Sequence, residues 1–433
     1  MTNFYDEAGD AYVSLMVSKI PHDPWDIYGY LDAPSGERTT PIDRNTTIYL
    51  YTPMPEITPR TVAEIHQEAA RYEEDMLQKT KEMPGNQRAD FLYTHMRSLR
   101  VRTAMLLGEK FSYDDMVKGL YDLTAPHYEE ADFQKALDDL KAVIPGTGPL
   151  YDRIDAFREK ITVPANRLAA TMTAAIEEFH RISVANMDIN PDSAPRLSFY
   201  GFGPHRAGLE LDGYVYDWDL DRINWEIVFS TEHKFVADDL ISFACHEMEP
   251  GHLTFIGLRT KAAYTTACHE LAIVPQFSPS SAFIEGGARF GIDLCLPGED
   301  LYAFEKELLF PLAGIDPGLI ECMPMWHNYR KQVNYAKHDL DRRMWDGDIS
   351  DAEATAFMQK YCLAPQNECA DAIHHLAADA GHFAAHDYSR DVITRYIRKQ
   401  AKTLPEQWAL YRELSMAHIS MSGIEDNTYR IIG

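Results

Sequence analysis

The chain has 433 residues, of which 45% are apolar and 25% are charged, and its formal charge is −26 at pH 7. This composition is typical of a globular protein with a large core, for which we expect two or three subdomains. The negative charge argues against nucleic acid and anionic membranes as partners. We therefore expect a small-molecule or peptide substrate, and the sequence leaves the oligomeric state open, a homodimer included.

The cellular location is expected to be cytoplasmic. The first residues carry neither the basic start nor the apolar stretch of a signal peptide, and no later run is long and apolar enough to span a bilayer. All six cysteines lie in the second half of the chain without a Cys-x-x-Cys pair. This pattern favours reduced thiols over a disulfide framework.

The first half of the chain is expected to be a helical scaffold preceded by an irregular arm. Residues 1–55 combine prolines and aromatic side chains without periodicity, so we expect an irregular packed arm there. Helix-forming residues dominate from Thr58 onward. They predict helices at residues 61–81, 86–108, 130–143, 150–161 and 164–183, and a further helix that starts at Ser112. We therefore assign residues 1–195 to an N-terminal arm and helical scaffold.

The pattern changes between Arg196 and Ser230, where Gly, Tyr, Trp, Val and Ile become frequent. Asp212-Gly213 is a turn signal, so we expect a small antiparallel sheet or hairpin. We assign residues 196–433 to a catalytic region that contains this hairpin, a metal-binding helix and C-terminal helices.

A His-Glu pair and a second histidine stand close together after the hairpin. His246-Glu247 is followed six residues later by His252. Helix-borne zinc enzymes use such a set to supply two imidazole ligands and a general-base carboxylate. On a regular helix, six residues would turn the two rings about 120° apart, so they could not reach one ion.

A helix is expected over residues 237–249, and it must break before the second histidine. Pro250 removes a backbone donor and disfavours helical geometry at the residue before it, and Gly251 permits unusual dihedral angles. These two residues stand where the convergence of His246 and His252 requires a break.

A third ligand is expected about thirty residues later. Glu285 lies in an apolar, helix-compatible run, residues 282–290, where a carboxylate needs a partner because an unpaired buried charge is costly. Catalytic zinc commonly takes three protein ligands and a water molecule. The neighbouring Gly286 and Gly287 would let another element approach the backbone closely.

These motifs, H-E-x-x-P-G-H at residues 246–252 and F-x-E-G at residues 283–286, resemble a broad bacterial family long catalogued as a domain of unknown function. Its members are zincin-like and are described as metallopeptidases. The resemblance covers the second half of the chain well and the first half more loosely. It implies a mostly helical metallohydrolase with His246, His252 and Glu285 as metal ligands and Glu247 as general base. Zincin-like enzymes often place an edge strand beside the metal, so the hairpin could bind an extended substrate or be purely structural.

The chain also departs from the family pattern. Leu253 stands where the family has a second adjacent histidine, and Gly287 stands where it has tryptophan. His-Leu at residues 375–376 and Ala-Gly-His at residues 380–382 replace Arg-Tyr and Pro-Gly-Gln. These departures motivate an alternative reaction without hydrolysis, in which a lyase, isomerase or cyclase acts on a small carboxylated metabolite.

Three further groups of polar residues follow. His269-Glu270 has no second histidine at ligand spacing, so it indicates a packed or solvated helix over residues 263–273 or a partner of a ligand imidazole. A helix over residues 326–345 places Arg330, His338 and Arg342 on one stripe. That stripe could bind a substrate carboxylate, stabilise an oxyanion or form an internal ion-pair network.

The last polar group lies at residues 370–387, where His375, His382 and His386 would share one helix face. They could form a second metal site, or the face could simply be hydrogen-bonded. The family resemblance favours the reading that this helix faces the metal, with His382 or His386 as proton donor or oxyanion partner. Tyr388 is another candidate for that role.

Together, the sequence predicts a mainly α protein with a small β element and one catalytic zinc. Bound zinc would lower the pKa of its water, and Glu247 would take the water proton during hydrolysis of an amide or peptide bond. Two histidines and one carboxylate also suit Fe²⁺, Mn²⁺ or Co²⁺. The third hypothesis, besides the non-hydrolytic enzyme, is a non-catalytic binding protein stabilised by zinc.

Overall fold

The computed structural model describes residues 4–16, 58–187, 189, 196–200, 211–219, 222–230, 234–365, 369–370, 373 and 381–430. The fold is mainly α-helical with one small sheet of three strands, which confirms the predicted fold class. Within these segments, no helix is both long enough and apolar enough to cross a membrane.

The chain divides into two compact units, and each is built from segments that are distant in sequence. The first unit comprises Met1–Ala125, His252–Gly287 and Ala384–Gly433, and the second comprises Pro126–Gly251 and Ala288–Phe383. The predicted boundary at residue 195 separates two regions of the sequence, and it stays a prediction.

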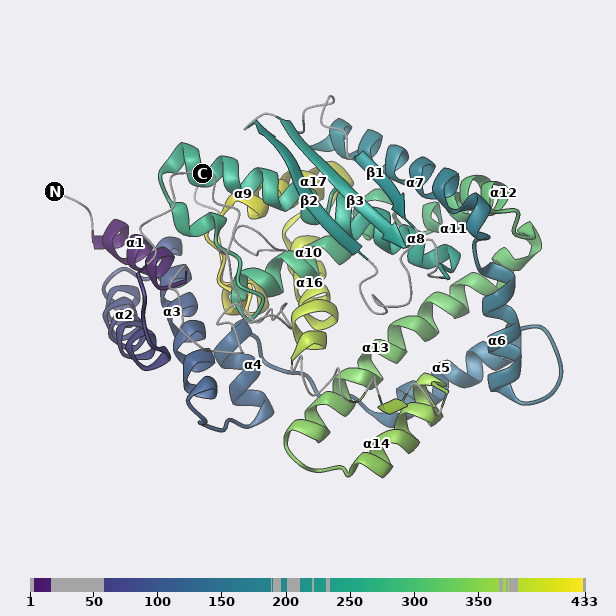
Figure 1. Ribbon diagram of the computed structural model, residues 1–433, viewed down its shortest axis with the longest axis horizontal. Coiled ribbons are helices and arrows are strands. Elements are labelled where there is room, and N and C mark those ends of the chain that lie inside the picture. Colours follow the sequence, from purple (N-terminus) through teal and green to yellow (C-terminus); the bar gives the residue numbers. More distant parts are fainter. Residues whose placement is uncertain are drawn as a thin grey trace. The chain divides into compact units, whose positions relative to one another are not determined.

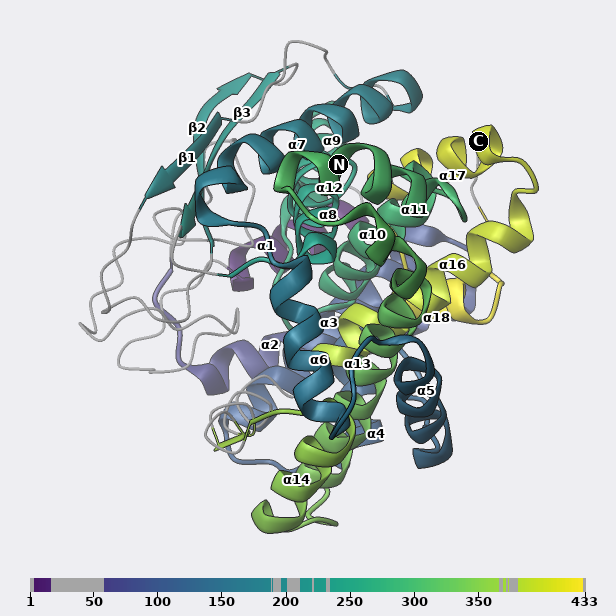
Figure 2. The same cartoon turned by 90° about the vertical axis from the view of Figure 1, so that its right-hand side faces the viewer.

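The first unit is entirely helical in its described residues. Its helices are α1 (Phe4–Met16), α2 (Val62–Glu82), α3 (Gln87–Leu106), α4 (Tyr113–Tyr121), α9 (His252–Thr266), α16 (Ser389–Gln400), α17 (Leu404–Met416) and α18 (Met421–Glu425). Figure 1 shows α2 and α3 side by side in blue, and α16, α17 and α18 gather in yellow in Figure 2. Ser112 caps α4, as its sequence signal predicted, and Thr61 caps α2 together with Glu64.

The expectation of an irregular arm is wrong for residues 4–16, which form α1. Tyr12, Val13, Leu15 and Met16 of this helix are buried in a core shared with α2, α3 and the 3₁₀-helix at residues 269–272. Burial of one apolar helix face supplies the stabilisation that the short segment lacks by itself. The rest of the arm, residues 17–55, lies outside the described residues.

The second unit contains the remaining helices and the sheet. Its helices are α5 (Glu130–Val143), α6 (Leu150–Ile161), α7 (Ala165–Asn186), α8 (Ala237–Phe243), α11 (Asp300–Phe304), α12 (Phe310–Ala313), α13 (Met323–Trp345) and α14 (Asp351–Phe357). Helix α10 (Pro279–Cys295) contributes residues 279–287 to the first unit and residues 288–295 to the second. The predicted bounds of α5 and α6 are confirmed residue for residue.

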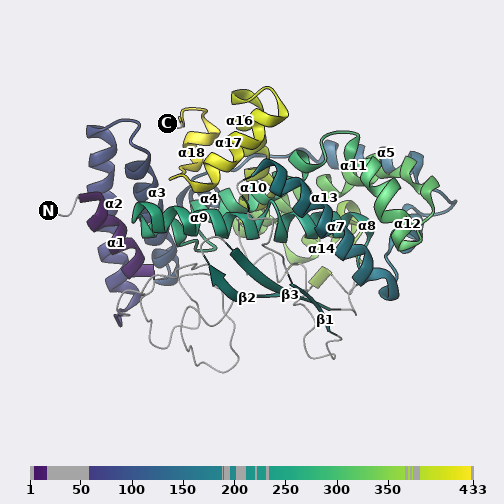
Figure 3. The same cartoon turned by 90° about the horizontal axis from the view of Figure 1, so that it is seen from above.

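The sheet consists of β1 (Arg196–Tyr200), β2 (Leu211–Asp219) and β3 (Arg222–Ser230). Strand β3 lies in the middle, parallel to β1 and antiparallel to β2 (Figure 3). The hairpin is thus confirmed, but its turn is not at Asp212-Gly213. Those residues lie inside β2, opposite Val228 and Ile227, because the ladder of strand hydrogen bonds overrides a local turn preference.

Candidate metal centre

The helix that was predicted to carry the first two site residues ends at the expected place. Helix α8 continues into a π-helix, Ala244–Met248, which carries His246 and Glu247. Glu249 then adopts an extended backbone with φ −126° and ψ 134°, and α9 begins at His252. The predicted break of the helix between the two histidines is therefore confirmed.

Gly251 makes this break possible because the chain folds tightly back on itself. Its N–H donates to the carbonyl oxygen of Cys245 at 3.0 Å. A Cβ atom at Gly251 would lie 2.0 Å from the carbonyl oxygen of His246 and 2.4 Å from that of Cys245. Both obstacles are backbone atoms, so no side-chain movement can make room for a larger residue.

The three expected ligands come together. One ligand atom from each of His246, His252 and Glu285 lies within 4.8 Å of the others. Their side chains are 11%, 19% and 19% exposed, whereas that of Glu247 is 31% exposed. Glu247 lies beside the first ligand, with 3.7 Å between its Oε1 and Nε2 of His246. It is thus the most accessible carboxylate of this group to water.

Glu285 is surrounded by imidazoles in the first unit. Its Oε2 lies 3.4 Å from Nε2 of His252 and 2.9 Å from Nε2 of His386. His386 comes from the π-helix Ala384–Tyr388, which precedes α16. The structure therefore brings His386 to the carboxylate of an expected metal ligand.

The two glycines after Glu285 allow close packing, as their sequence position predicted. A Cβ atom at Gly286 would lie 2.3 Å from Oγ of Ser389, and one at Gly287 would lie 2.6 Å from Cζ of Phe255. The carbonyl oxygen of Gly287 also accepts a hydrogen bond from Tyr411 at 3.1 Å. The ring of Phe255 thus occupies the space beside Gly287 that a larger side chain would need.

The donor set fits a catalytic zinc ion. Two imidazole nitrogens and one carboxylate oxygen form one of the common three-residue sets for such sites and leave a position for water. The spread of the ligand atoms, within 4.8 Å, is compatible with closure around one ion, since ligand bonds of about 2 Å place donors about 3–4 Å apart.

A buried carboxylate inside the motif was missed by the sequence argument. Glu249 is 3% exposed, and its Oε2 lies 2.7 Å from Nδ1 of His180 on α7. Burial raises the pKa of Glu249, although its contact with His180 acts in the opposite direction. A glutamate at the break of a buried helix was the available signal, but His180 lies 69 residues away and has no motif of its own.

The second His-Glu pair lies in the 3₁₀-helix His269–Ala272 rather than in a longer helix. Glu270 joins Cys268 and His418 in a second group whose ligand atoms lie within 4.8 Å of one another. Arg88 also binds this group, with its Nε 2.7 Å from Oε1 of Glu270, and His418 lies 3.1 Å from the same oxygen. Burial raises the pKa of Glu270, but His418 and Arg88 more than offset this and hold it below its usual range.

The expected polar stripe lies on α13 in the second unit. Arg330 binds Oδ1 of Asp239 at 2.6 Å and lies 3.5 Å from Oδ2 of Asp238. Arg342 donates to the carbonyl oxygen of Pro126 at 3.0 Å. These contacts favour the internal ion-pair network over substrate binding for Arg330, and the substrate role of both arginines stays a prediction.

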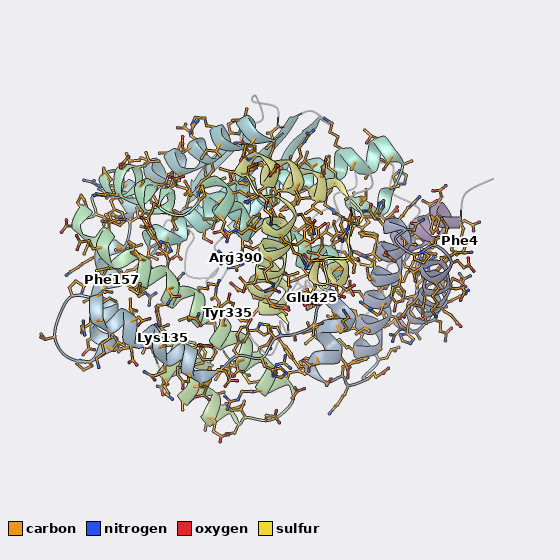
Figure 4. All side chains as sticks on the ribbon, turned by 180° about the vertical axis from the view of Figure 1, so that it is seen from behind. Phe4, Lys135, Phe157, Tyr335, Arg390 and Glu425 are labelled. Atoms are coloured by element: carbon orange, nitrogen blue, oxygen red, sulfur yellow. The ribbon has the colours of Figure 1, made fainter. Side chains whose placement is uncertain are left out.

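His338, the third residue of the stripe, is fully buried. Its Nδ1 lies 3.4 Å from the hydroxyl of Tyr128, which stacks on Tyr335 with 4.8 Å between ring centroids. Tyr335 is labelled in Figure 4. Complete burial gives His338 no direct contact with solvent, and its catalytic role stays a prediction.

The single helix face expected at residues 370–387 is not formed. Gly381 has φ +82°, a left-handed conformation that interrupts a helix, and its N–H donates to Asp341 at 2.9 Å. His382 and His386 follow this turn, while His375 lies outside the described residues. The spacing argument failed because it assumed helical geometry through a glycine.

Tyr388 is engaged by a carboxylate of the first unit. Its hydroxyl donates to Oε1 of Glu425, labelled in Figure 4, at 2.7 Å. Burial and this contact raise the pKa of Tyr388 to about 12. The phenol therefore stays protonated at neutral pH and cannot act as a base there.

Comparisons with known proteins show the fold alone. No protein-family model matches the sequence, and no curated protein matches it. A solved structure described as a putative lipoprotein from Colwellia psychrerythraea has a TM-score of 0.52 and 14% identity, over 85% of this chain and 69% of that one. Another, described as a putative lipoprotein of unknown function from Shewanella oneidensis, has a TM-score of 0.45 and 14% identity, over 85% and 73%.

The tight break predicts that Gly251→Ala disrupts the site. The added Cβ must push apart the backbone at residues 245–246, which should cost about 1–3 kcal/mol of stability and separate the two histidines. Thermal unfolding and zinc titration of the purified variant measure both effects. Gly318→Ala is the matched control, because its Cβ would meet only the side chain of Asp316 at 3.3 Å. Equal thermal stability and equal zinc binding of the two variants would contradict the role of Gly251 in the helix break.

The lowered pKa of Glu270 predicts an acid-sensitive contribution to stability. This contribution is complete above the unfolded value of 4.5 and is lost as the pH falls through the lower folded pKa. Glu270→Gln should lower the free energy of unfolding at pH 7 by about 3 kcal/mol and flatten its decrease as the pH falls below about 4.5. Urea unfolding at several pH values tests this. Glu82→Gln, at an exposed ion pair with Lys79, should have a much smaller effect.

Proposed function

We propose that this protein is a zinc-dependent hydrolase of an amide or peptide bond. The observation that carries the proposal is the convergence of His246, His252 and Glu285, with Glu247 directly after the first ligand in the sequence. This arrangement supplies a three-residue metal site and a carboxylate that can accept a proton. The helix break at Gly251 supports it, because the six-residue spacing works only with that break.

The residues of the chain take the following roles in this proposal. Bound zinc would supply a Lewis acid and a water molecule with a lowered pKa. Glu247, the more exposed carboxylate of the group, would be the base that takes a proton from water and passes it to the leaving amine. His386, with Nε2 2.9 Å from Oε2 of Glu285, would help to orient that carboxylate.

Several other roles remain proposals with less support. His382 and Tyr388 are kept as candidate donors to the developing oxyanion, and His338, Arg330 and Arg342 as residues that act on the substrate. The cytoplasmic location and the absence of nucleic acid or membrane partners also remain proposals. The two structural neighbours are described as lipoproteins, and that description applies to those proteins.

Metal analysis tests the first step of the proposal. Protein purified without a chelating tag should contain about one equivalent of zinc. His246→Ala and Glu285→Ala should lose it, since each removes one of three ligands. Elemental analysis of the three proteins gives the answer. Iron or manganese in place of zinc would change the identity of the proposed metal. The absence of metal from all three proteins would contradict the proposed function.

Replacement of Glu247 by Gln tests the catalytic step. The amide cannot accept the proton of the bound water, so turnover of a peptide and acyl-amide library should fall at least about 10²-fold, while the zinc content stays at the parent level. Mass spectrometry of the library measures products that gain one water. Unchanged turnover would contradict the role of Glu247.

The same library separates the proposed function from its alternatives. A small carboxylic acid that is consumed without gain of water would favour the lyase, isomerase or cyclase hypothesis. Zinc that is retained without turnover of any compound would favour a binding protein stabilised by the metal. In that case, Glu247→Gln should bind partners as the parent does.

A further inference from the structure

The carboxylate of Glu249 is fixed from a distant part of the chain. It occupies the single extended residue between the π-helix that carries His246 and the turn that leads to His252. Only 3% of Glu249 is exposed, and its Oε2 lies 2.7 Å from Nδ1 of His180. Helix α7, which bears His180, packs directly against the π-helix Ala244–Met248.

Loss of the contact between Glu249 and His180 would cost free energy. A buried carboxylate without a partner costs several kcal/mol, so Glu249 would move toward water or take up a proton. Movement of its side chain would carry the extended backbone with it. Because only Pro250 and Gly251 separate Glu249 from His252, a shift at this residue changes the distance between the two imidazole ligands.

Helix α10 packs against Pro250, the residue that follows Glu249. A Cβ atom at Gly291 would lie 3.0 Å from Cγ of Pro250 and 3.2 Å from Sγ of Cys245, so α10 packs closely on the turn. The break is therefore fixed at two successive residues, Pro250 by packing and Glu249 by its contact with His180. Packing restrains the ring of Pro250, and the carboxylate contact restrains the direction of the chain before it.

We propose that His180 is a positioning residue of the metal site, which sets the separation of His246 and His252 by anchoring Glu249. This inference rests on the proposed function, because it requires that the two histidines bind metal. His180 needs no contact with the ion for this role. It acts as an outer partner that orients ligands, and loss of such partners in metal sites costs about 10–100-fold in affinity.

Zinc affinity of the whole protein tests the proposal. Competition with a chromophoric chelator should show that His180→Ala binds zinc about 10–100-fold more weakly than the parent. His180→Asn, whose amide nitrogen takes the place of Nδ1, should recover most of the affinity. The visible spectrum of bound Co²⁺, which reports ligand geometry, should change in His180→Ala and return toward the parent in His180→Asn.

A matched control separates positioning from general stability. His327 forms an equivalent contact in the same unit, with Nε2 2.8 Å from Oε1 of Glu305, whose side chain is fully buried. His327→Ala should lower the melting temperature about as much as His180→Ala does, yet keep the zinc affinity and the Co²⁺ spectrum of the parent. A purely structural role of His180 would make the two variants indistinguishable.

A second variant covers the case in which His180→Ala does not fold. His180→Leu combined with Glu249→Met replaces both partners by apolar groups, which is often nearly neutral for stability. The proposal expects weaker zinc binding in this folded variant. Parent-like affinity and Co²⁺ spectrum in His180→Ala or in the double variant would overturn the positioning role alone. A parent protein that binds no zinc would overturn the proposed function and this inference with it.

Discussion

The spacing of six residues between His246 and His252 is the constraint on which the site depends. A continuous helix would point the two rings in different directions, so the chain must leave the helix and start another within three residues. Gly251 permits this because its backbone lies against the carbonyl groups of Cys245 and His246, where no Cβ fits. The π-helix before the break and the start of α9 after it follow from the same requirement.

Buried or half-buried glutamates paired with histidines recur in both units. Glu249, Glu270, Glu285 and Glu305 lie between 2.7 and 3.1 Å from His180, His418, His386 and His327, respectively. Burial raises the pKa of Glu249 and Glu305, although a histidine acts against it. At Glu270 the additional Arg88 reverses the balance, and the pKa is lowered. An imidazole alone therefore compensates a buried carboxylate only in part.

The local structure could be predicted from the sequence, whereas long-range partners could not. Helix-forming composition gave α5 and α6 residue for residue, and Pro250 with Gly251 marked the break. The pairing of His180 with Glu249 depends on tertiary packing, so no spacing could reveal it. At Gly213 strand pairing overrode a local turn preference, whereas at Gly381 a left-handed glycine interrupts the helix that the spacing argument assumed.

Among the residues that the structure describes, two groups could hold a metal by composition, and their charges distinguish them. Arg88 already supplies a positive charge at 2.7 Å from Glu270, and a cation there would have to displace or repel the guanidinium. Glu285 instead lies beside His252 and His386, which are neutral donors when deprotonated and carry no obligatory charge. The fixed charge of Arg88 therefore disfavours a divalent ion at the Cys268 group, and the proposed metal is assigned to His246, His252 and Glu285.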